Sequence, residues 1–213
     1  MSPYPFTSSS RAIFILALVL AGFSACVNIG PDSEPIQTFV FDPDLPAAQH
    51  QSATSGVLLV STPRAYTTYQ TRRLIYTDRA FEIRSYAYNT WADSPAAMLE
   101  PLLIRVAERS GQFRSVVGLS AGVRADYRLD TEITALHQEF GQSGSIAHVA
   151  LRLRIIDLAD RSVVAQSDID VTAPAPSDDA YGGVMAINDA LSEALSDLLR
   201  FIVQEGPRPS DGG

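Results

Sequence analysis

The sequence has 213 residues, which is enough for one domain with a leader and enough to bury a core without disulfides or metal ions. Its formal net charge of -8 argues against nucleic acid as a partner, because phosphate backbones are bound by basic surfaces. The single cysteine excludes an intrachain disulfide and any metal site made of several cysteines.

The N-terminal segment has the pattern of a secretory signal peptide. An apolar run at residues 12–21 is followed by small residues up to Cys26, and the run is too short to stay in a bilayer as a spanning helix. Residues 23–26 (FSAC) resemble the bacterial lipobox, in which the cysteine thiol takes a diacylglycerol, although Phe23 stands where leucine is usual. We therefore predict a signal peptide at residues 1–25 and lipid attachment at Cys26. The alternative is an ordinary signal peptide with a chance cysteine.

A tether and two strands follow the leader. Residues 26–35 contain glycine, two prolines and two acids, which is typical of an extended spacer. The alternating residues 36–41 (IQTFVF) predict a strand with both faces at least partly covered, and the apolar run in residues 56–61 predicts a buried strand. Residues 44–55 form a polar loop between them, in which His50 has no acidic or histidine neighbour and is expected to be solvated.

Tyrosine and arginine are concentrated in residues 56–91, which also contain the only tryptophan. Protein interfaces are enriched in aromatic and arginine side chains, because both combine a large contact area with directional hydrogen bonds. An ordinary solvated strand face is the alternative interpretation. The candidates for contact with a partner are Tyr66, Tyr69, Arg72, Arg73, Tyr76 and Trp91.

Within this segment the pattern predicts a loop and a hairpin. Residues 63–70 contain a proline and lack a helical period, so we expect an irregular loop. Residues 74–76 and 81–88 resemble the two arms of a hairpin around a turn at residues 77–80. The side chains expected to pack inward are Leu74, Phe81 and Ile83.

A helix is predicted after Trp91, since Ser94 is a good N-cap and Pro95 is tolerated in the first turn. Apolar residues then recur at helical spacing until residues 110–111. Pro101 conflicts with one continuous helix, so either the helix bends there or it begins at Pro101.

The second half of the sequence predicts a strand meander and a final helix. After a short strand at residues 113–117, period-2 alternation marks three long strands at residues 125–140, 146–157 and 162–172, and the acids of the first could lie opposite the arginines of the second. Apolar residues at steps of three and four predict a helix over residues 179–204, with Gly206 as a left-handed end. The predicted organisation is a signal peptide at 1–25, a tether at 26–35, one α+β domain at 36–205 and a disordered tail at 206–213.

We find no signature of an active site. The three histidines are His50, His137 and His148, and no nucleophile motif accompanies them. His137 and His148 could approach each other across a hairpin, with Glu139 nearby, but cross-strand polar pairing is far commoner than a metal site. We therefore predict no catalytic residue, no metal and no cofactor.

The mature chain resembles the ABC-type transport auxiliary lipoprotein family, the group that includes the paraquat-inducible protein C-like lipoproteins. The resemblance is strongest in residues 56–91. The sequence departs from the family pattern at Phe23, at the two-proline start of the first helix and at residues 93–94, where the family often has an acid followed directly by proline. The residues that carry the resemblance are Cys26, 41–43 (FDP), Pro63, Tyr66, 70–76 (QTRRLIY), 82–83 (EI), 86–89 (YAYN), Trp91, 127–129 (YRL) and 180–181 (AY).

This resemblance implies an α+β fold in which two helices pack on one face of an antiparallel or mixed sheet. It implies a lipid-anchored periplasmic protein that serves an ABC transporter of the MCE type, which moves phospholipids or other hydrophobic molecules between the inner and outer membranes. The expected partner is an MCE-domain protein, with a homo-oligomer as an open alternative. Val27 after the cysteine favours the outer membrane, periplasmic face, over the inner membrane. The other function classes are a lipid-binding carrier with an apolar cavity and an outer-membrane assembly lipoprotein.

Overall fold

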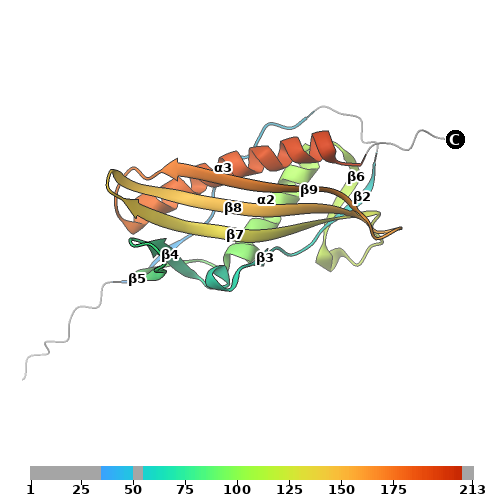
Figure 1. Cartoon of the computed structure of the whole chain (residues 1–213). Coiled ribbons are helices and arrows are strands. Elements are labelled where there is room, and N and C mark those ends of the chain that lie inside the picture. The colour runs from blue at the N-terminus through green and yellow to red at the C-terminus, as the bar shows by residue number, and fades with distance from the viewer. Residues whose placement is uncertain (1–34, 50–54, 208–213) are drawn as a thin grey trace, which may run out of the picture. The chain divides into compact units, whose positions relative to one another are not determined.

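The structure is a computed structural model that describes residues 35–49 and 55–207 (Figure 1). The predicted signal peptide, Cys26, the tether up to residue 34, His50 and residues 208–213 lie outside the described residues. In the described part, nine strands form one mixed sheet and two α-helices accompany it. The strands are β1 (Gln37–Phe39), β2 (Ser55–Val60), β3 (Arg64–Ala65), β4 (Arg73–Thr77), β5 (Arg84–Trp91), β6 (Phe113–Gly118), β7 (Tyr127–Gly141), β8 (Gly144–Asp157) and β9 (Val163–Pro174).

The long strands β7, β8 and β9 form the predicted antiparallel meander. The acids of β7 lie opposite the arginines of β8, as expected: Asp130 faces Arg154 and Glu132 faces Arg152 in the register. One of these pairs is an ion pair, in which Arg152 Nη1 lies 3.7 Å from a carboxylate oxygen of Glu132.

The other edge of β7 is occupied by three short strands in succession. β2, β3 and β4 each pair with β7 in parallel orientation, at residues 127–129, 132–133 and 138–139 of β7. β6 extends the sheet in parallel beyond β2, and β5 pairs antiparallel with β4, as the predicted hairpin requires. β1 pairs in parallel with β5. The sequence therefore predicted these strands except β3, which lies within the loop expected at residues 63–70, but it did not predict their parallel pairing.

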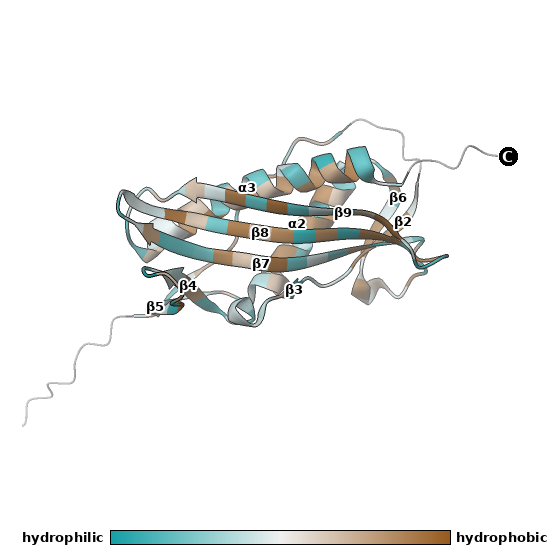
Figure 2. Cartoon of the chain, viewed as in Figure 1, coloured by the Kyte–Doolittle hydropathy of each residue, from teal (hydrophilic) through white to brown (hydrophobic). Residues whose placement is uncertain are grey.

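Two helices, α2 (Pro95–Arg109) and α3 (Ala180–Glu205), pack on one face of the sheet, which confirms the predicted α+β fold (Figure 1). Alternate residues of β8 are buried against them, whereas the intervening residues, apart from the buried Ala150, are only partly buried. Figure 2 shows hydrophobic and hydrophilic residues along this strand. α2 begins at Pro95, capped by the Ser94 hydroxyl, which accepts from the Ala97 N–H at 3.3 Å. Pro101 lies inside this helix, so the helix does not begin there. Among the described residues, no helix has the length and apolar character needed to cross a membrane.

The structure corrects three local expectations. β1 is shorter than residues 36–41, and the face that carries Ile36 and Val40 is not covered, since these side chains are 68% and 55% exposed, whereas Phe39 and Phe41 on the other face are partly buried against the core. Gly206 has a φ of -65° and therefore does not end α3 in the left-handed conformation. Phe81 and Ile83 do not pack inward, as described below, whereas Leu74 is buried as expected.

Gln138 on β7 connects the hairpin, the meander and α3. Its side chain is buried, its Nε2 donates to Ser145 Oγ at 2.8 Å, and its Oε1 accepts from the Tyr86 hydroxyl at 2.8 Å. Gly183 in the first turn of α3 lies directly against it, since a Cβ at this position would be 2.1 Å from Gln138 Oε1. A glycine is therefore needed here for the close approach of α3 to β7.

Gly183→Ala should lower the free energy of unfolding by about 1–3 kcal/mol, because the added methyl group would displace the buried Gln138 amide from its two hydrogen bonds. Urea denaturation at neutral pH measures the change. Gly118→Ala is the matched control, since a Cβ there meets its nearest atom at 3.4 Å and fits. Equal stability of the Gly183→Ala and wild-type proteins would contradict this account.

The N-cap of α3 provides a pH-dependent test. Asp179 Oδ1 accepts from the Gly182 N–H at 2.7 Å and from the Ser177 hydroxyl at 2.9 Å, and these bonds, the first above all, lower the pKa of the Asp179 carboxyl. Asp179→Ala should cost about 1 kcal/mol at neutral pH. The folded-state pKa of Asp179 lies below its unfolded-state pKa. The part of the stability that depends on the Asp179 charge is therefore present above about pH 4 and is lost as the pH falls further. Asp179→Asn, which keeps the cap acceptor, should retain most of the stability but lose this pH dependence in urea denaturation.

Candidate interaction surface

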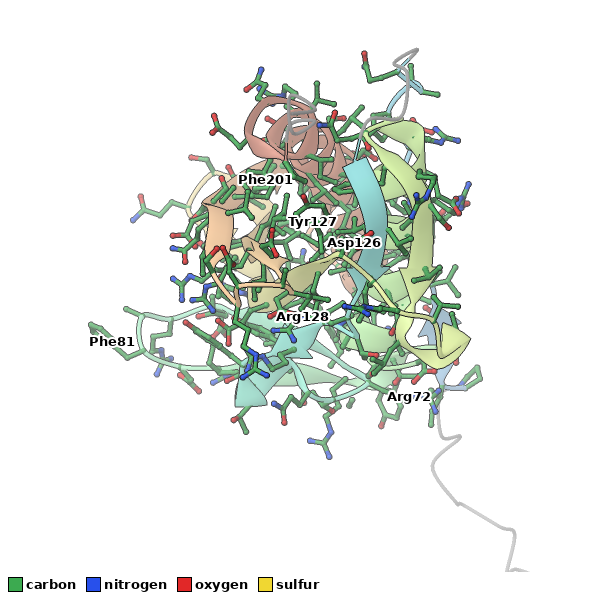
Figure 3. The ribbon with its side chains drawn as sticks, turned by 90° about the vertical axis from the view of Figure 1, so that its right-hand side faces the viewer. Arg72, Phe81, Asp126, Tyr127, Arg128 and Phe201 are labelled. Carbon is green, nitrogen blue, oxygen red and sulfur yellow. The ribbon has the colours of Figure 1, made fainter. Side chains whose placement is uncertain are left out.

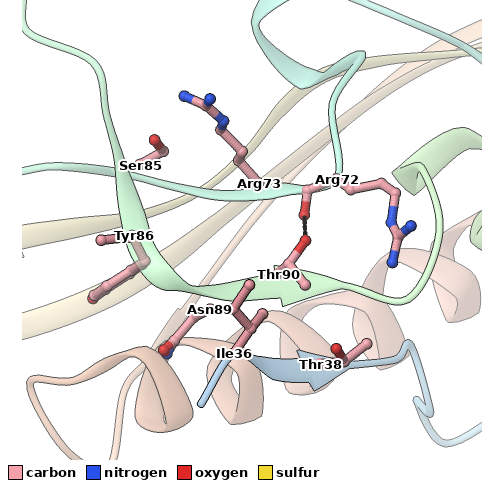
Figure 4. Close-up of a pocket in the computed structure, with 9 residues that line it drawn as sticks. Ile36, Thr38, Arg72, Arg73, Ser85, Tyr86, Asn89 and Thr90 are labelled. Atoms are coloured by element: carbon pink, nitrogen blue, oxygen red, sulfur yellow. Dashed lines mark hydrogen bonds between the residues drawn. The ribbon is translucent and has the colours of Figure 1, made fainter. Parts of the chain in front are cut away.

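A shallow groove runs beside the β4–β5 hairpin and contains two of the predicted interface residues, Arg72 and Arg73 (Figure 4). Its volume is about 720 Å³, and it is open to solvent. One wall is formed by β1 and by Ile36, the residue just before it, whose side chain is 68% exposed. The other residues that line the groove are Thr38, Ser85, Tyr86, Ala87, Asn89 and Thr90. We call this feature the arginine groove.

Arg72 is held in place by the end of β5. Its carbonyl oxygen accepts from the Trp91 N–H and from the Thr90 hydroxyl, both at 2.7 Å, and its Nε donates to the Trp91 carbonyl at 3.0 Å. Arg73 follows in β4 and lies opposite Thr90 in the register. The guanidinium group of Arg72 is thus positioned by backbone contacts.

Neither arginine of the groove forms an ion pair with a carboxylate of the described residues. Other surface arginines do: Arg84 pairs with Asp78 and Glu82, and Arg152 pairs with Asp168. Two neighbouring positive charges beside an exposed isoleucine can therefore contact an acidic and partly apolar surface.

Tyr76 lies on a second groove, which Arg73 borders as well. Its ring is half-buried and packs against Tyr86 at a centroid distance of 4.7 Å and edge-on against Phe140 at 5.7 Å. Tyr86 has a structural role, because its hydroxyl donates to Gln138 and burial raises its pKa to about 12. Tyr76 therefore contributes packing to the hairpin in addition to any surface role.

Tyr66 is exposed but does not line the arginine groove. Its N–H donates to the Ile133 carbonyl at 3.0 Å, and its hydroxyl interacts with the Arg152 guanidinium on β8. The structure thus does not bring Tyr66 together with Arg72 and Arg73.

Tyr69 and Trp91 lie in the core, with exposed fractions of 7% and 2%. The Tyr69 hydroxyl is 2.9 Å from His137 Nδ1, and Trp91 packs edge-on against Phe41 at a centroid distance of 4.9 Å. The expectation that Tyr69 is left at the surface is therefore wrong. In a segment without regular alternation, composition does not distinguish a buried aromatic ring from an exposed one.

Exposed apolar side chains at the hairpin were missed by the sequence reasoning. Phe81 is fully exposed, with a φ of 67°, and Ile83 is 53% exposed. Figure 3 shows Phe81 at the tip of the hairpin, pointing away from the body of the protein. The turn between β4 and β5 includes residues 78–83 instead of 77–80, so the alternation begins later than predicted.

The structure also brings His137, Glu139 and His148 together. Glu139 Oε1 lies 2.9 Å from His137 Nε2 and 3.0 Å from His148 Nδ1. Within the described part of the chain, the polar partners of these two histidines are Tyr69, Glu139 and Asp170, and no serine or threonine hydroxyl is hydrogen-bonded to them. The cluster thus lacks the hydroxyl–imidazole pair of a serine hydrolase.

The fold resembles those of two solved structures. A Xanthomonas campestris protein of the DUF330 family has 23% sequence identity and a TM-score of 0.71, over 80% of this chain and 96% of that one. The crystal structure of an uncharacterised protein has 12% identity and a TM-score of 0.62, over 79% and 99% of the two chains. No curated protein gave a significant sequence match. At these identities the two structures support the fold alone.

The family model described as ABC-type transport auxiliary lipoprotein component matches residues 39–202, which include α2, all but the last three residues of α3 and nearly all of the sheet. This is a family of auxiliary transport components and not of enzymes. The match covers well over half of the chain and agrees with the resemblance found in residues 56–91. The chain belongs to the ABC-type transport auxiliary lipoprotein component family.

Proposed function

We propose that this lipoprotein serves an ABC transport system of the MCE type, which moves phospholipids or other hydrophobic molecules between the two membranes. In this proposal it is anchored at the periplasmic face of the outer membrane and acts by contact with an MCE-domain protein. The single observation that supports a contact role is the arginine groove, in which two exposed arginines without an ion-pair partner among the described residues lie beside Ile36.

The groove has the chemistry of a protein interface. Arginine contributes large area and several hydrogen-bond donors, and a partner carboxylate can receive two of them at once. Since Arg72 is already positioned by Trp91 and Thr90, less side-chain entropy is lost when a partner binds. The expected partner surface is acidic, with an apolar contact for Ile36.

The predicted anchor is compatible with this role. A lipid on Cys26 and a tether of residues 26–35 would allow the domain to move up to about 35 Å from the membrane surface. Attachment of several acyl chains gives stable membrane association, since each buried methylene contributes about 0.8 kcal/mol. The domain would thus stay near the membrane and still reach a partner.

The alternatives have less support in the structure. A lipid carrier needs an enclosed apolar cavity, but the space between the helices and the sheet is occupied by core side chains such as Leu103, Leu153 and Leu195. An outer-membrane assembly lipoprotein would share the anchor and the layered architecture. Such a protein would copurify with a β-barrel, whereas the proposed role predicts copurification with an MCE-domain protein.

The double variant Arg72→Ala, Arg73→Ala tests the contact. It should reduce the amount of MCE-domain protein recovered with the lipoprotein by at least about tenfold, because central interface arginines commonly contribute over 1 kcal/mol each. The melting temperature should be unchanged within a few degrees, since both side chains are exposed. Quantitative crosslinking in membranes measures the recovery.

The matched control is Arg105→Ala, Arg114→Ala, which removes two exposed arginines from α2 and from β6 at the far edge of the sheet. It should leave recovery unchanged. An equal loss in both double variants, or a loss that follows a lower melting temperature, would contradict a specific role for the groove.

Cys26→Ser tests the anchor. Serine lacks the thiol that takes the lipid, so the variant should no longer sediment with the outer-membrane fraction. Cell fractionation followed by immunoblotting checks this. Persistence of the variant in the outer membrane would argue against anchoring through Cys26.

A further inference from the structure

His137, Glu139 and His148 form a compact cluster on the sheet face opposite the helices. His137 and His148 are directly opposite each other in the β7–β8 register, and Glu139 follows two residues later on the same face. Ligand atoms from the three residues all lie within 4.8 Å of one another. His137 is buried, and the other two are partly buried. We call this feature the histidine cluster.

A bulge in β7 creates the cluster. Leu129, Thr131 and Ile133 face the helices, and strict alternation would send His137 and Glu139 the same way. The register shifts between Ile133 and Ala135, and the extra residue reverses the alternation beyond it. Both side chains therefore meet His148 on the outer face. Bulges of this kind re-aim side chains and are common beside functional sites.

The ring nitrogen of each imidazole that does not face Glu139 contacts a second polar group. Tyr69 Oη lies 2.9 Å from the Nδ1 of His137, and a carboxylate oxygen of Asp170 lies 2.9 Å from the Nε2 of His148. The nitrogens that remain, Nε2 of His137 and Nδ1 of His148, both point to Glu139. Histidines that ligate metals show this pattern, because the outer partner fixes the ring orientation and the tautomer.

We propose that His137 Nε2, His148 Nδ1 and the Glu139 carboxylate bind one divalent transition-metal ion, of which zinc fits best. Two imidazoles and one carboxylate are a common zinc ligand set, and nitrogen ligands disfavour magnesium and calcium. In a tetrahedral zinc site the ligand atoms lie about 3.4 Å apart. The present separations of 2.9 and 3.0 Å from Glu139 Oε1 are slightly shorter than this spacing, and all three ligand atoms lie within 4.8 Å of one another.

The protonation states of the cluster are compatible with a metal ion. Burial lowers the pKa of His137, which favours the neutral imidazole that binds metals. Burial alone would raise the pKa of Glu139, but its hydrogen bonds with His148 and His137 oppose this effect, and the pKa is lowered. Glu139 is thus held as the carboxylate.

A bound ion would connect three parts of the fold. It would join β7 to β8 directly and, through Asp170, orient β9. Through the Tyr69 hydroxyl it would also hold the 3-10 helix η1 (Thr67–Tyr69), which immediately precedes the arginine groove in the chain. The site is therefore expected to stabilise the segment from which the groove is built.

The test is a zinc titration of the purified full chain in detergent, after removal of metals with a chelator. One equivalent of Zn²⁺ per chain should bind, and the apparent melting temperature should rise with Zn²⁺ concentration but not with Mg²⁺. Co²⁺ should give the visible absorption of a low-coordinate site and should be displaced by Zn²⁺. Absence of saturable Zn²⁺ binding, or equal binding of Mg²⁺, would overturn the proposal.

Variants connect the binding to the cluster. Glu139→Gln and His148→Gln should abolish the one-equivalent site, whereas His50→Ala, which removes the only histidine outside the cluster, should leave it intact. Asp170→Ala and Tyr69→Phe remove only the outer partners and should weaken binding about 10–100-fold. Circular dichroism confirms that each variant is folded. Unchanged binding in Glu139→Gln and His148→Gln would show that Zn²⁺ binds elsewhere and would overturn the assignment.

Discussion

The pairing of both edges of β7 is the constraint on which the rest of the structure depends. One edge pairs antiparallel with β8 over almost the whole strand, and the other receives β2, β3 and β4 one after another in parallel. Parallel strands cannot be joined by a tight turn, so β2, β3 and β4 are connected to β7 only through long segments of the chain. Their positions in the sheet are therefore determined by their pairing with β7. The strands β2, β3 and β4 are thus laid along a strand that begins only at Tyr127.

This arrangement divides the aromatic and arginine residues of that segment into two groups. Tyr69 and Trp91 are buried, Tyr69 against His137 and Trp91, the last residue of β5, against Phe41. Arg72 lies between them in the chain, and its carbonyl is bound to the Trp91 N–H. The buried aromatic rings fix the backbone, and the arginine side chains are presented at the surface as a result. Aromatic burial and arginine exposure are therefore two consequences of the same local geometry.

Much of the fold could be predicted from the sequence because its signals are local. Period-2 alternation marked β7, β8 and β9, and Ser94 with Pro95 marked the start of α2. The orientation of Tyr69 and Phe81 could not be predicted in this way. Tyr69 lies in a single 3-10 turn, and Phe81 lies in a turn with a positive φ, so neither has a periodic pattern that would reveal its burial.

The histidine cluster shows how one irregularity can hide a site from sequence analysis. In an uninterrupted strand, His137 and Glu139 would lie on the same face as Ile133 and would face the helices, where a charged carboxylate is costly. The bulge transfers both residues to the outer face without disturbing the pairing of β7 with β8 on either side. It also turns Leu136 and Gln138 inward, and Gln138 then meets Gly183 and Tyr86. One extra residue in β7 thus creates both the polar contact that joins α3 to the hairpin and the cluster on the opposite face, which couples the two faces of the sheet through a single backbone feature.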